Sequence, residues 1–391
     1  MVSLEFPSQL DRWRYLEHDG VSATDGLAVD EAIMYGYGRE RTAAWPATLR
    51  LYTYRADCAL VGRYQNLDDE IDAEFCAAHG VEVGRRPTGG GAIIMGPGQL
   101  GVALVARAVA DETPRRALKR YASGIIGGLA SLGITAAFRS KNDLEVDGRK
   151  IAGLGLYLDA EGAILFHTSV LVDLDVERML SVLRIPGAKL SDKAVERVEE
   201  RVTTVSREVG RRCAATDVRQ DFSTGFAAAF DIELEDGTVS DDEWRHAREL
   251  AETRYGNAEW IRQRSPRRDA RGSAVLKTPA GLLRIYAGVH AQTLKSVLVT
   301  GDFNVLPVAI GRLESALKWC RADPERIAAV TAASLRENDL GVPHDAVAGA
   351  VWEAARKAIE LQHDAVHPGR DGSCYFPEPT GPSSDDEAAR S

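Results

Sequence analysis

Two short segments of the chain carry residue types that could neutralise negative charge. The first, residues 84–101, reads GRRPTGGGAIIMGPGQLG and sets Arg85 and Arg86 before three consecutive glycines. Glycines lack a Cβ, so their backbone N–H groups can approach an anion closely, and arginine adds fixed charge with paired donors. The segment matches neither a Walker A loop nor the opening of a Rossmann helix, because a strand is expected after it. The residues alone indicate either an anion-binding loop or a mobile hairpin loop with two solvated arginines.

The second segment holds one lysine among small residues. Lys150 comes two residues after an Asp-Gly pair, which is typical of a type I′ hairpin turn, and Ala152 and Gly153 follow it. Small neighbours leave room for a ligand beside the strand, so the ammonium group could reach the same anion as Arg86. Taken alone, Lys150 could equally be an exposed strand lysine.

Composition limits the classes of protein to consider. The chain has 391 residues, of which 45% are hydrophobic and 27% charged, and its formal net charge is −10. These values predict a soluble globular protein of two or three domains that does not bind nucleic acid in general. We find no apolar stretch of about 18 residues and no secretory signal, so no membrane association is expected. Five scattered cysteines without a C-x-x-C pair argue against a disulfide framework or a zinc site and predict a cytoplasmic protein.

Hydrophobic periodicity and turn residues predict an α+β organisation. Helices are expected over 25–40, 68–80, 115–132, 308–322, 324–336 and 344–360, and much of 176–265 reads as helical. Strands are expected within 49–63, 81–86, 92–95, 100–108, 281–289 and 294–300, with a three-stranded meander over 142–175. The composition of 265–273 (SPRRDARGS) indicates a linker, and the low apolar content of 376–391 predicts a disordered tail.

Taken together, the motifs resemble the lipoate–protein ligase family, which belongs with the biotin ligases. The resemblance rests on RRPTGGGA (85–92), NDLEVDGRKIAG (142–153), GRYQN (62–66), GLAVDEAIM (26–34) and FHTSVLVDLD (166–175). Residues 277–303 and 310–327 are similar to the small accessory domain of bipartite ligases. The resemblance implies a biotin/lipoate ligase-like mixed sheet with flanking helices. It also implies a catalytic domain over 1–264, a linker over 265–273 and an α+β accessory domain over 274–365.

The resemblance further implies an ATP-dependent ligase, cytoplasmic and monomeric. Such an enzyme activates lipoate or octanoate with ATP and Mg²⁺ to an acyl-adenylate, then transfers the acyl group to a lysine of a lipoyl carrier protein. Carried over residue by residue, Lys150 is the catalytic residue, Asp143 is the candidate Mg²⁺ ligand, and the lipoyl group contacts Arg86, Gly91, Lys150, Gly153 and His167. The ATP and acyl-adenylate site takes in Arg86, Thr88, Gly89, Gly90, Gly91, Ala92, Ile93, Ile94, Asn142, Asp143 and Lys150.

The chemistry of these residues agrees with that reaction. A carboxylate and an α-phosphate must approach each other, and Arg86 with Lys150 can neutralise their repulsion. The glycine backbone supplies oriented donors, and Lys150 can stabilise the acyl oxygen as negative charge develops on it. The acyl chain needs an apolar slot, for which the strands at 60–61 and 152–156 are candidates.

The chain departs from the family pattern in ways that keep other functions open. Met95-Gly96 stands where His-Asp is usual, Phe166-His167 replaces a pair of histidines, and Gly26 replaces an asparagine. One alternative is an ATP-independent octanoyl- or lipoyltransferase that draws on an acyl carrier protein. A cysteine-dependent version of it is disfavoured, because GITAAFRSKNDL (133–144) offers Ser140 and no cysteine. The others are a biotin ligase and a non-catalytic lipoyl-binding or sensor protein.

Overall fold

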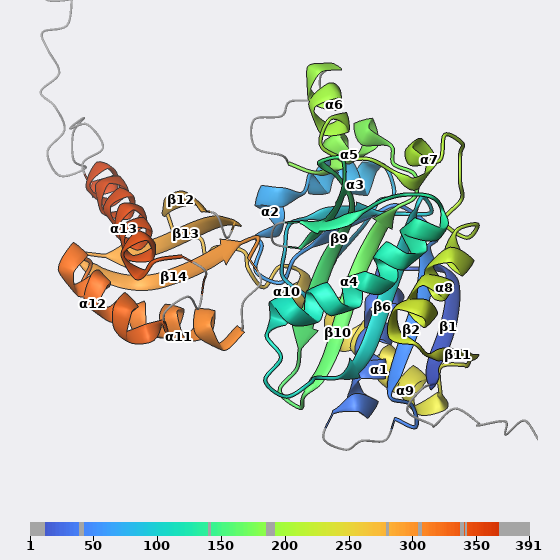
Figure 1. Cartoon of the computed structure of the whole chain (residues 1–391). Helices are drawn as coiled ribbons and strands as arrows, with labels where there is room; N and C mark the ends of the chain where they lie inside the picture. The colour runs from blue at the N-terminus through green and yellow to red at the C-terminus, as the bar shows by residue number, and fades with distance from the viewer. Residues whose placement is uncertain are drawn as a thin grey trace, which may run out of the picture.

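A computed structural model describes residues 12–38, 43–139, 142–184, 192–278, 281–303, 307–336, 340 and 342–366. These residues form a larger N-terminal unit and a smaller C-terminal unit, each built on its own sheet (Figure 1). The predicted tail at 376–391 lies outside the described residues.

An eight-stranded mixed sheet organises the N-terminal unit. Its strand order is β11-β1-β2-β6-β10-β9-β8-β7, and β1 runs parallel to both of its neighbours, whereas the other pairs are antiparallel. The strands are β1 (Arg12–Val21), β2 (Ala47–Tyr54), β6 (Gln99–Arg107), β7 (Ala137–Arg139), β8 (Asp143–Val146), β9 (Arg149–Leu158), β10 (Ala163–Leu171) and β11 (Glu233–Asp236).

Helices cover both faces of this sheet because its central strands are apolar on both sides. In β6, Leu100, Val102 and Leu104 belong to one hydrophobic cluster, and Ala103 and Val105 belong to another. A strand points successive side chains to opposite faces, so β6 separates two cores. The first core contains α4 (Pro114–Ser131) and α8 (Arg219–Phe230), and the second contains α1 (Ala23–Tyr37) and α9 (Asp241–Leu250).

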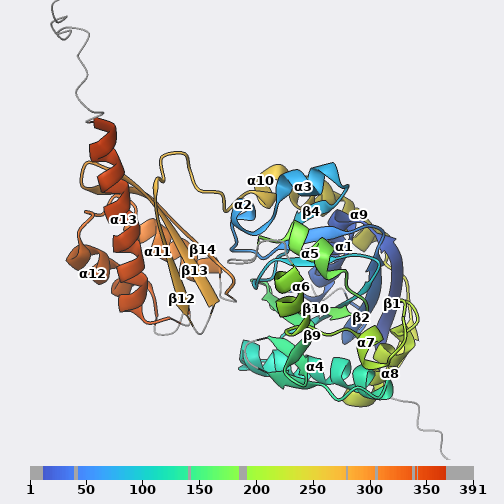
Figure 2. The same cartoon turned by 90° about the horizontal axis from the view of Figure 1, so that it is seen from above.

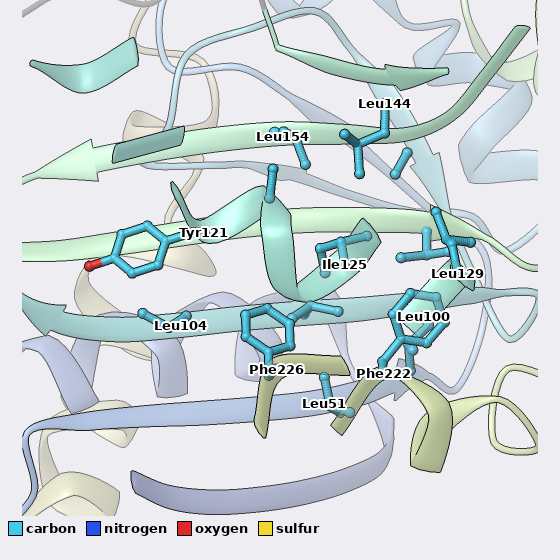
Figure 3. Packing of buried hydrophobic residues seen from close by; sticks show 14 of the residues in the cluster. Leu51, Leu100, Leu104, Tyr121, Ile125, Leu129, Leu144, Leu154, Phe222 and Phe226 are labelled. Atoms are coloured by element: carbon cyan, nitrogen blue, oxygen red, sulfur yellow. The ribbon is translucent and has the colours of Figure 1, made fainter. Parts of the chain in front are cut away.

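The core under α4 and α8 depends on close contact between the two helices. Phe222 and Phe226 of α8 pack with Ile125 and Leu129 of α4 above the sheet (Figure 3). The helix backbones approach so closely that a Cβ on Gly225 would stand 2.2 Å from the backbone nitrogen of Gly128. Glycine at 225 is therefore required by helix packing.

We predict that Gly225→Ala lowers the free energy of unfolding by about 2 kcal/mol or more, because the added methyl group forces α4 and α8 apart. Urea unfolding monitored by circular dichroism measures the change. The matched control is Gly349→Ala in the exposed part of a C-terminal helix, where an added Cβ meets nothing within 4 Å. That control should stabilise the protein by up to about 1 kcal/mol. Equal effects of the two substitutions would contradict the packing argument.

A small second sheet carries the glycine segment. It has the order β4-β3-β5, and the residues between β4 and β5 form the loop RPTGGGA. The shorter helices of the N-terminal unit lie in the connections between its larger elements and in the chain that leads on to the C-terminal unit. The strands of the small sheet are β3 (Cys58–Val61), β4 (Glu82–Arg85) and β5 (Ile93–Met95). The shorter helices are α2 (Leu67–Glu70), α3 (Ala73–Ala78), α5 (Val176–Val182), α6 (Asp192–Glu199), α7 (Val205–Glu208), a π-helical turn (Ala251–Tyr255) and α10 (Ala258–Ile261).

The C-terminal unit is a three-stranded antiparallel sheet packed against helices. Its elements are β12 (Gly272–Thr278), β13 (Gly281–His290), β14 (Thr293–Gly301), α11 (Pro307–Leu317), α12 (Pro324–Ser334) and α13 (His344–Val366). It stands beside the N-terminal unit, with the end of β14 directed toward it (Figure 2). Tyr64 stacks on Phe303 with ring centroids 5.3 Å apart, and Arg284 and Tyr286 bond to the carboxylates of Glu70 and Asp69.

The predicted elements are largely present, and the missed ones have identifiable causes. The Asp147-Gly148 turn has φ values of 48° and 79°, as a type I′ turn requires. Strands β1, β7, β11 and β12 were not predicted. β1 and β11 are rich in charged residues that mask the apolar alternation, and β7 is only three residues long. β12 begins at Gly272, inside the stretch expected to be a linker. Among the described helices, we find none long and apolar enough to cross a membrane.

Candidate active site

A cavity of about 110 Å³ joins the glycine loop to strands β9 and β10. Of the residues predicted for the site, those lining it are Arg86, Thr88, Gly89, Gly90, Gly91, Ala92, Ile93, Asn142, Lys150, Gly153 and His167. Ile94 and Asp143 do not line it. Ile94 packs in a separate apolar cluster beneath the small sheet, on the opposite side of β5. The cavity is also lined by residues that the sequence did not predict for the site, although Met95 was noted as a departure from the family pattern: Leu27, Tyr52, Tyr54, Met95, Thr168 and Ser169.

Arg86 holds the glycine loop by hydrogen bonds to its backbone carbonyls. Its Nη1 donates to the carbonyl of Leu60 (2.6 Å), and its Nη2 donates to the carbonyls of Gly91 (2.8 Å) and Gly89 (3.3 Å). The side chain is buried, and burial lowers the pKa of the guanidinium to about 10. We expected Arg86 to offer paired donors to a ligand, yet these donors are directed at the chain's own carbonyls. Arg86 therefore acts on the cavity mainly by holding the glycine loop in place.

The end of β3 touches the same loop backbone to backbone. A Cβ on Gly62 would stand 2.1 Å from the carbonyl oxygen of Gly90, which itself has φ of 91°. The side chain of Gln65 accepts a hydrogen bond from the Gly62 N–H at 2.9 Å and so fixes the turn. This contact explains why GRYQN and the triple glycine occur together in the sequence.

Lys150 enters the cavity from β9. Its Nζ lies 2.8 Å from Oδ1 of Asp143, and both side chains are about one-third exposed. Nζ also stands 3.0 Å from the position that a Cβ on Gly153 would take, so glycine at 153 makes room for the ammonium group. Asn142 completes this side of the cavity and donates from Nδ2 to the carbonyl of Leu154 at 2.7 Å.

The pairing of Asp143 with Lys150 bears on the expected Mg²⁺ ligand. Oδ1 of Asp143 already balances the charge of Lys150. In the part of the chain that the structure describes, no group of three or more His, Cys, Asp or Glu is arranged to hold a metal ion. The donor set around Asp143 therefore does not fit a resident Mg²⁺.

A buried charged network supports the cavity on the α1 side. Asp30 is fully buried and accepts hydrogen bonds from Arg50 (2.6 Å) and from Nε2 of His167 (2.7 Å). Burial alone would raise the pKa of the Asp30 carboxyl, but Arg50 and His167 outweigh it and hold that pKa below its usual value. Removing one member of such a network leaves an uncompensated buried charge, which is strongly destabilising. The network therefore fixes His167 at the cavity wall.

The remaining wall is apolar. Leu27, Tyr54, Leu60 and Met95 line the cavity and belong to one hydrophobic cluster on the α1 side of the sheet. Met95 is 3% exposed and stands where a histidine was expected. The replacement makes this end of the cavity suited to a hydrocarbon chain.

Gly96, the second departure from the His-Asp pattern, has a steric explanation. A Cβ at 96 would stand 2.5 Å from Oδ1 of Asp57. The other carboxylate oxygen of Asp57 pairs with Nε of Arg178 at 3.0 Å. The space that a side chain at position 96 would need is thus occupied by an ion pair.

The described cysteines are all buried. Cys58, Cys76, Cys213 and Cys320 have no more than 8% of their surface exposed, and burial raises the pKa of the Cys58 thiol well above its usual value. Among the described residues that line the cavity, we find no thiol. Ser140, considered as a replacement for a nucleophilic cysteine, lies outside the described residues.

Comparison with known proteins places the chain in a family. The model of the lipoyl protein ligase A/B catalytic domain matches residues 22–227, and the chain belongs to this family. An octanoyltransferase LipM of Symbiobacterium thermophilum is 29% identical over 273 residues, covering 63% of this chain and 97% of the relative. The octanoyltransferase LipM of Brevibacillus brevis is 28% identical over 280 residues, covering 64% and 99%.

Solved structures agree with the fold. The bipartite lipoate protein ligase of Thermoplasma acidophilum, studied with its E2 lipoyl domain, has a TM-score of 0.57 and 26% identity, covering 64% of this chain and 96% of that one. LipL1 of P. falciparum, in complex with lipoate, has a TM-score of 0.63 at 16% identity and covers 82% of this chain and 94% of that one, which extends the likeness in fold into the C-terminal unit. The predicted family and the predicted mixed sheet with flanking helices are confirmed.

The predicted ATP-dependent ligase activity is wrong. The sequence relatives named above, and others at 24% to 29% identity, are octanoyltransferases, which favours the alternative of a transferase. The physical reason for the error is that a lysine, a glycine loop and a partly apolar cavity are suited to acyl transfer in either case. These motifs therefore do not report how the acyl group is activated.

We predict that the protein loses stability as the pH falls from about 6.5 toward 4. Nδ1 of His18 accepts a hydrogen bond from Nε of Arg50 at 2.8 Å, and burial, followed by the charge of Arg50, lowers the pKa of His18 from 6.5 to about 4. In this interval the unfolded chain binds a proton that the folded chain excludes, so the folded state is progressively disfavoured. Urea unfolding at several pH values, with His18→Gln as the comparison, measures the effect. An unchanged pH dependence in His18→Gln would show that another group is responsible.

Proposed function

We propose that this chain is an ATP-independent acyltransferase that moves an octanoyl group from an acyl carrier protein to a lysine of a lipoyl carrier protein. The observation that carries the proposal is a single cavity with Lys150 and the glycine loop at one end and an apolar wall at the other. The octanoyltransferase relatives support the choice of acyl group.

The apolar wall suits an unbranched hydrocarbon chain. Ser169 pairs with Gly153 and His167 pairs with Gly155 across β9 and β10, and both face the cavity. A strand rises about 3.3 Å per residue, so the cavity runs about 7 Å along β10 from the Lys150 end toward His167. Each methylene group buried there stabilises the complex by about 0.8 kcal/mol. Binding energy along the chain can thus position the acyl carbon beside Lys150.

Lys150 can stabilise the transition state. When the acceptor amine attacks, negative charge develops on the acyl oxygen, and the Lys150 ammonium group, which lines the cavity beside the glycine loop, can compensate it. The amine forms an amide bond with the acyl carbon, the carbon–sulfur bond of the thioester breaks, and the sulfur leaves with the proton that the amine gives up. One donor of this kind is worth about 3 kcal/mol in enzymes studied by mutation.

The donors of the loop support transfer without a nucleotide. The N–H of Gly90 donates to the carbonyl of Phe303 in the C-terminal unit (3.4 Å), and the Nη groups of Arg86 donate to backbone carbonyls. A nucleotide phosphate would have to displace these internal partners. A thioester carries no such charge, so it can enter the cavity with the loop in this conformation.

The cavity also supports direct transfer from one carrier to the other. The described residues that line it include no cysteine. We infer that the acceptor lysine attacks the donor thioester while both carriers are bound. Ser140 lies outside the described residues, and a mass gain of one octanoyl group on Ser140 of the enzyme would contradict direct transfer.

The decisive experiment supplies octanoyl-acyl carrier protein and a lipoyl carrier domain to the purified protein without ATP. We expect the carrier domain to gain the mass of an octanoyl group. A mass gain that requires ATP and free octanoate, with release of pyrophosphate, would refute the proposal.

In this assay Lys150→Ala should lower kcat by about 10²- to 10³-fold, the usual loss when one oxyanion donor is removed. The control is Lys119→Ala, which removes an exposed lysine on α4 and should leave kcat unchanged. Circular dichroism establishes that both variants are folded. Wild-type activity of Lys150→Ala would remove this residue from the site.

A further inference from the structure

We propose that the segment Arg201–Thr203, together with Glu208, is a clamp that aims Lys150 into the cavity, which makes Thr203 and Glu208 positioning residues. The inference rests on the proposed function, in which Lys150 acts on the acyl oxygen. The observation behind it is that the Lys150 side chain faces the cavity, which a regular strand would not allow.

In a regular strand, Lys150 would face the opposite side of the sheet. Side chains separated by two residues share a face, so Lys150 would lie with Ala152 and Leu154. Both of those residues belong to the core under α4, where Leu154 is seen in Figure 3. The Lys150 ammonium group instead stands beside Gly153, at the cavity, while Ile151 is fully buried in the α4 core.

A β-bulge produces this exchange of faces. The pairing of β8 with β9 shifts between Leu144, which opposes Ala152, and Glu145, which opposes Lys150, so Ile151 is the additional residue. Bulges of this kind redirect side chains and recur beside active sites. A bulge also disturbs the hydrogen bonds of the ladder, so the backbone at Lys150 needs other partners.

The segment Arg201–Thr203 supplies those partners. The N–H of Lys150 donates to the carbonyl of Arg201 (2.9 Å), and the N–H of Thr203 donates to the carbonyl of Lys150 (2.8 Å). Lys150 thus forms a parallel bridge with Val202, outside the named strands. Both backbone groups of the reactive lysine are held by one short segment.

Glu208 connects the clamp to the residue next to Lys150. Its carboxylate accepts a hydrogen bond from the hydroxyl of Thr203, which is 1% exposed, and another from Nη2 of Arg149 at 3.0 Å. The connections therefore run from Lys150 through Thr203 and Glu208 to Arg149 and back along the chain to Lys150. Because these hydrogen bonds and the chain form a closed ring, the backbone at the bulge is restricted in its motion.

The clamp is itself anchored at the end of β10. Val205 is fully buried in the core under α4, and the N–H of Ser206 donates to the carbonyl of Val172 at 2.9 Å. The segment is therefore fixed to the same strand that forms the other wall of the cavity. A loss of its side-chain contacts should loosen Lys150 while leaving the apolar slot in place.

The test is the kinetics of Glu208→Gln, which keeps the shape of the side chain and removes its charge. A displacement of about 1 Å at a reacting group can cost about a hundredfold in rate, so we expect kcat to fall between about tenfold and a hundredfold. The KM for octanoyl-acyl carrier protein should stay unchanged, because the acyl slot is formed by other residues. The control is Glu112→Gln just before α4, where a similarly buried carboxylate accepts two hydrogen bonds from Arg120 (2.7 and 2.8 Å). It should leave kcat unchanged.

Two further measurements separate positioning from general stability. Hydrogen exchange at the Lys150 amide should speed up in Glu208→Gln and stay unchanged in Glu112→Gln, because only the first loosens the clamp. Thr203→Val should lower kcat as Glu208→Gln does, whereas Thr203→Ser, which keeps the hydroxyl group, should retain wild-type kcat.

The proposal is overturned if Glu208→Gln keeps wild-type kcat and wild-type exchange at Lys150, or if Glu112→Gln lowers kcat to the same degree. If the wild-type protein transfers no octanoyl group, the proposed function fails, yet the exchange measurement at Lys150 still decides whether the clamp exists. A variant that unfolds is replaced in the comparison by the Thr203→Val and Thr203→Ser pair.

Discussion

The site depends on one buried cation that is bonded to backbone. Arg86 holds the carbonyls of Leu60, Gly89 and Gly91 at once, so the end of β3 and the glycine loop keep a fixed relation. A flexible triple glycine would otherwise sample many conformations, at an entropic cost for any ligand. The buried guanidinium converts that loop into a rigid wall. The apolar slot and Lys150 line the same cavity as this wall, so a ligand can contact all three only while the wall keeps its place.

The sequence predicted many of the residues that line the cavity, but it did not predict how their side chains are arranged. It indicated that Arg86 and Lys150 share a site, because a cation beside consecutive glycines and a lysine after a hairpin turn both point to one anion. It could not reveal that the Arg86 guanidinium donates its hydrogen bonds to backbone carbonyls, because every residue has a carbonyl group and the residue pattern does not show which of them accepts. Tyr54 and Met95 were missed for a related reason, because an apolar residue of a cavity wall looks like a core residue until the fold defines the cavity.

The sequence also could not reveal how the acyl group is activated. An acyl-adenylate and an acyl thioester present the same acyl carbon, and both need a donor for the developing charge. A lysine ammonium group can supply that donor in either reaction, so the presence of Lys150 does not distinguish them. The distinction proposed above rests on the Gly90 N–H, which donates to the carbonyl of Phe303, a residue more than two hundred positions away. Such a contact is a property of the tertiary structure.

The close approach of Gly96 to Asp57 couples three positions of the chain. An aspartate at position 96 would drive a side chain into a carboxylate that is already paired with Arg178, and would set two negative charges side by side. A polar side chain at position 96 therefore requires a simultaneous change at Asp57, and a change at Asp57 would leave the Arg178 guanidinium without this carboxylate. Engineering of this end of the cavity has to treat positions 57, 96 and 178 as one unit.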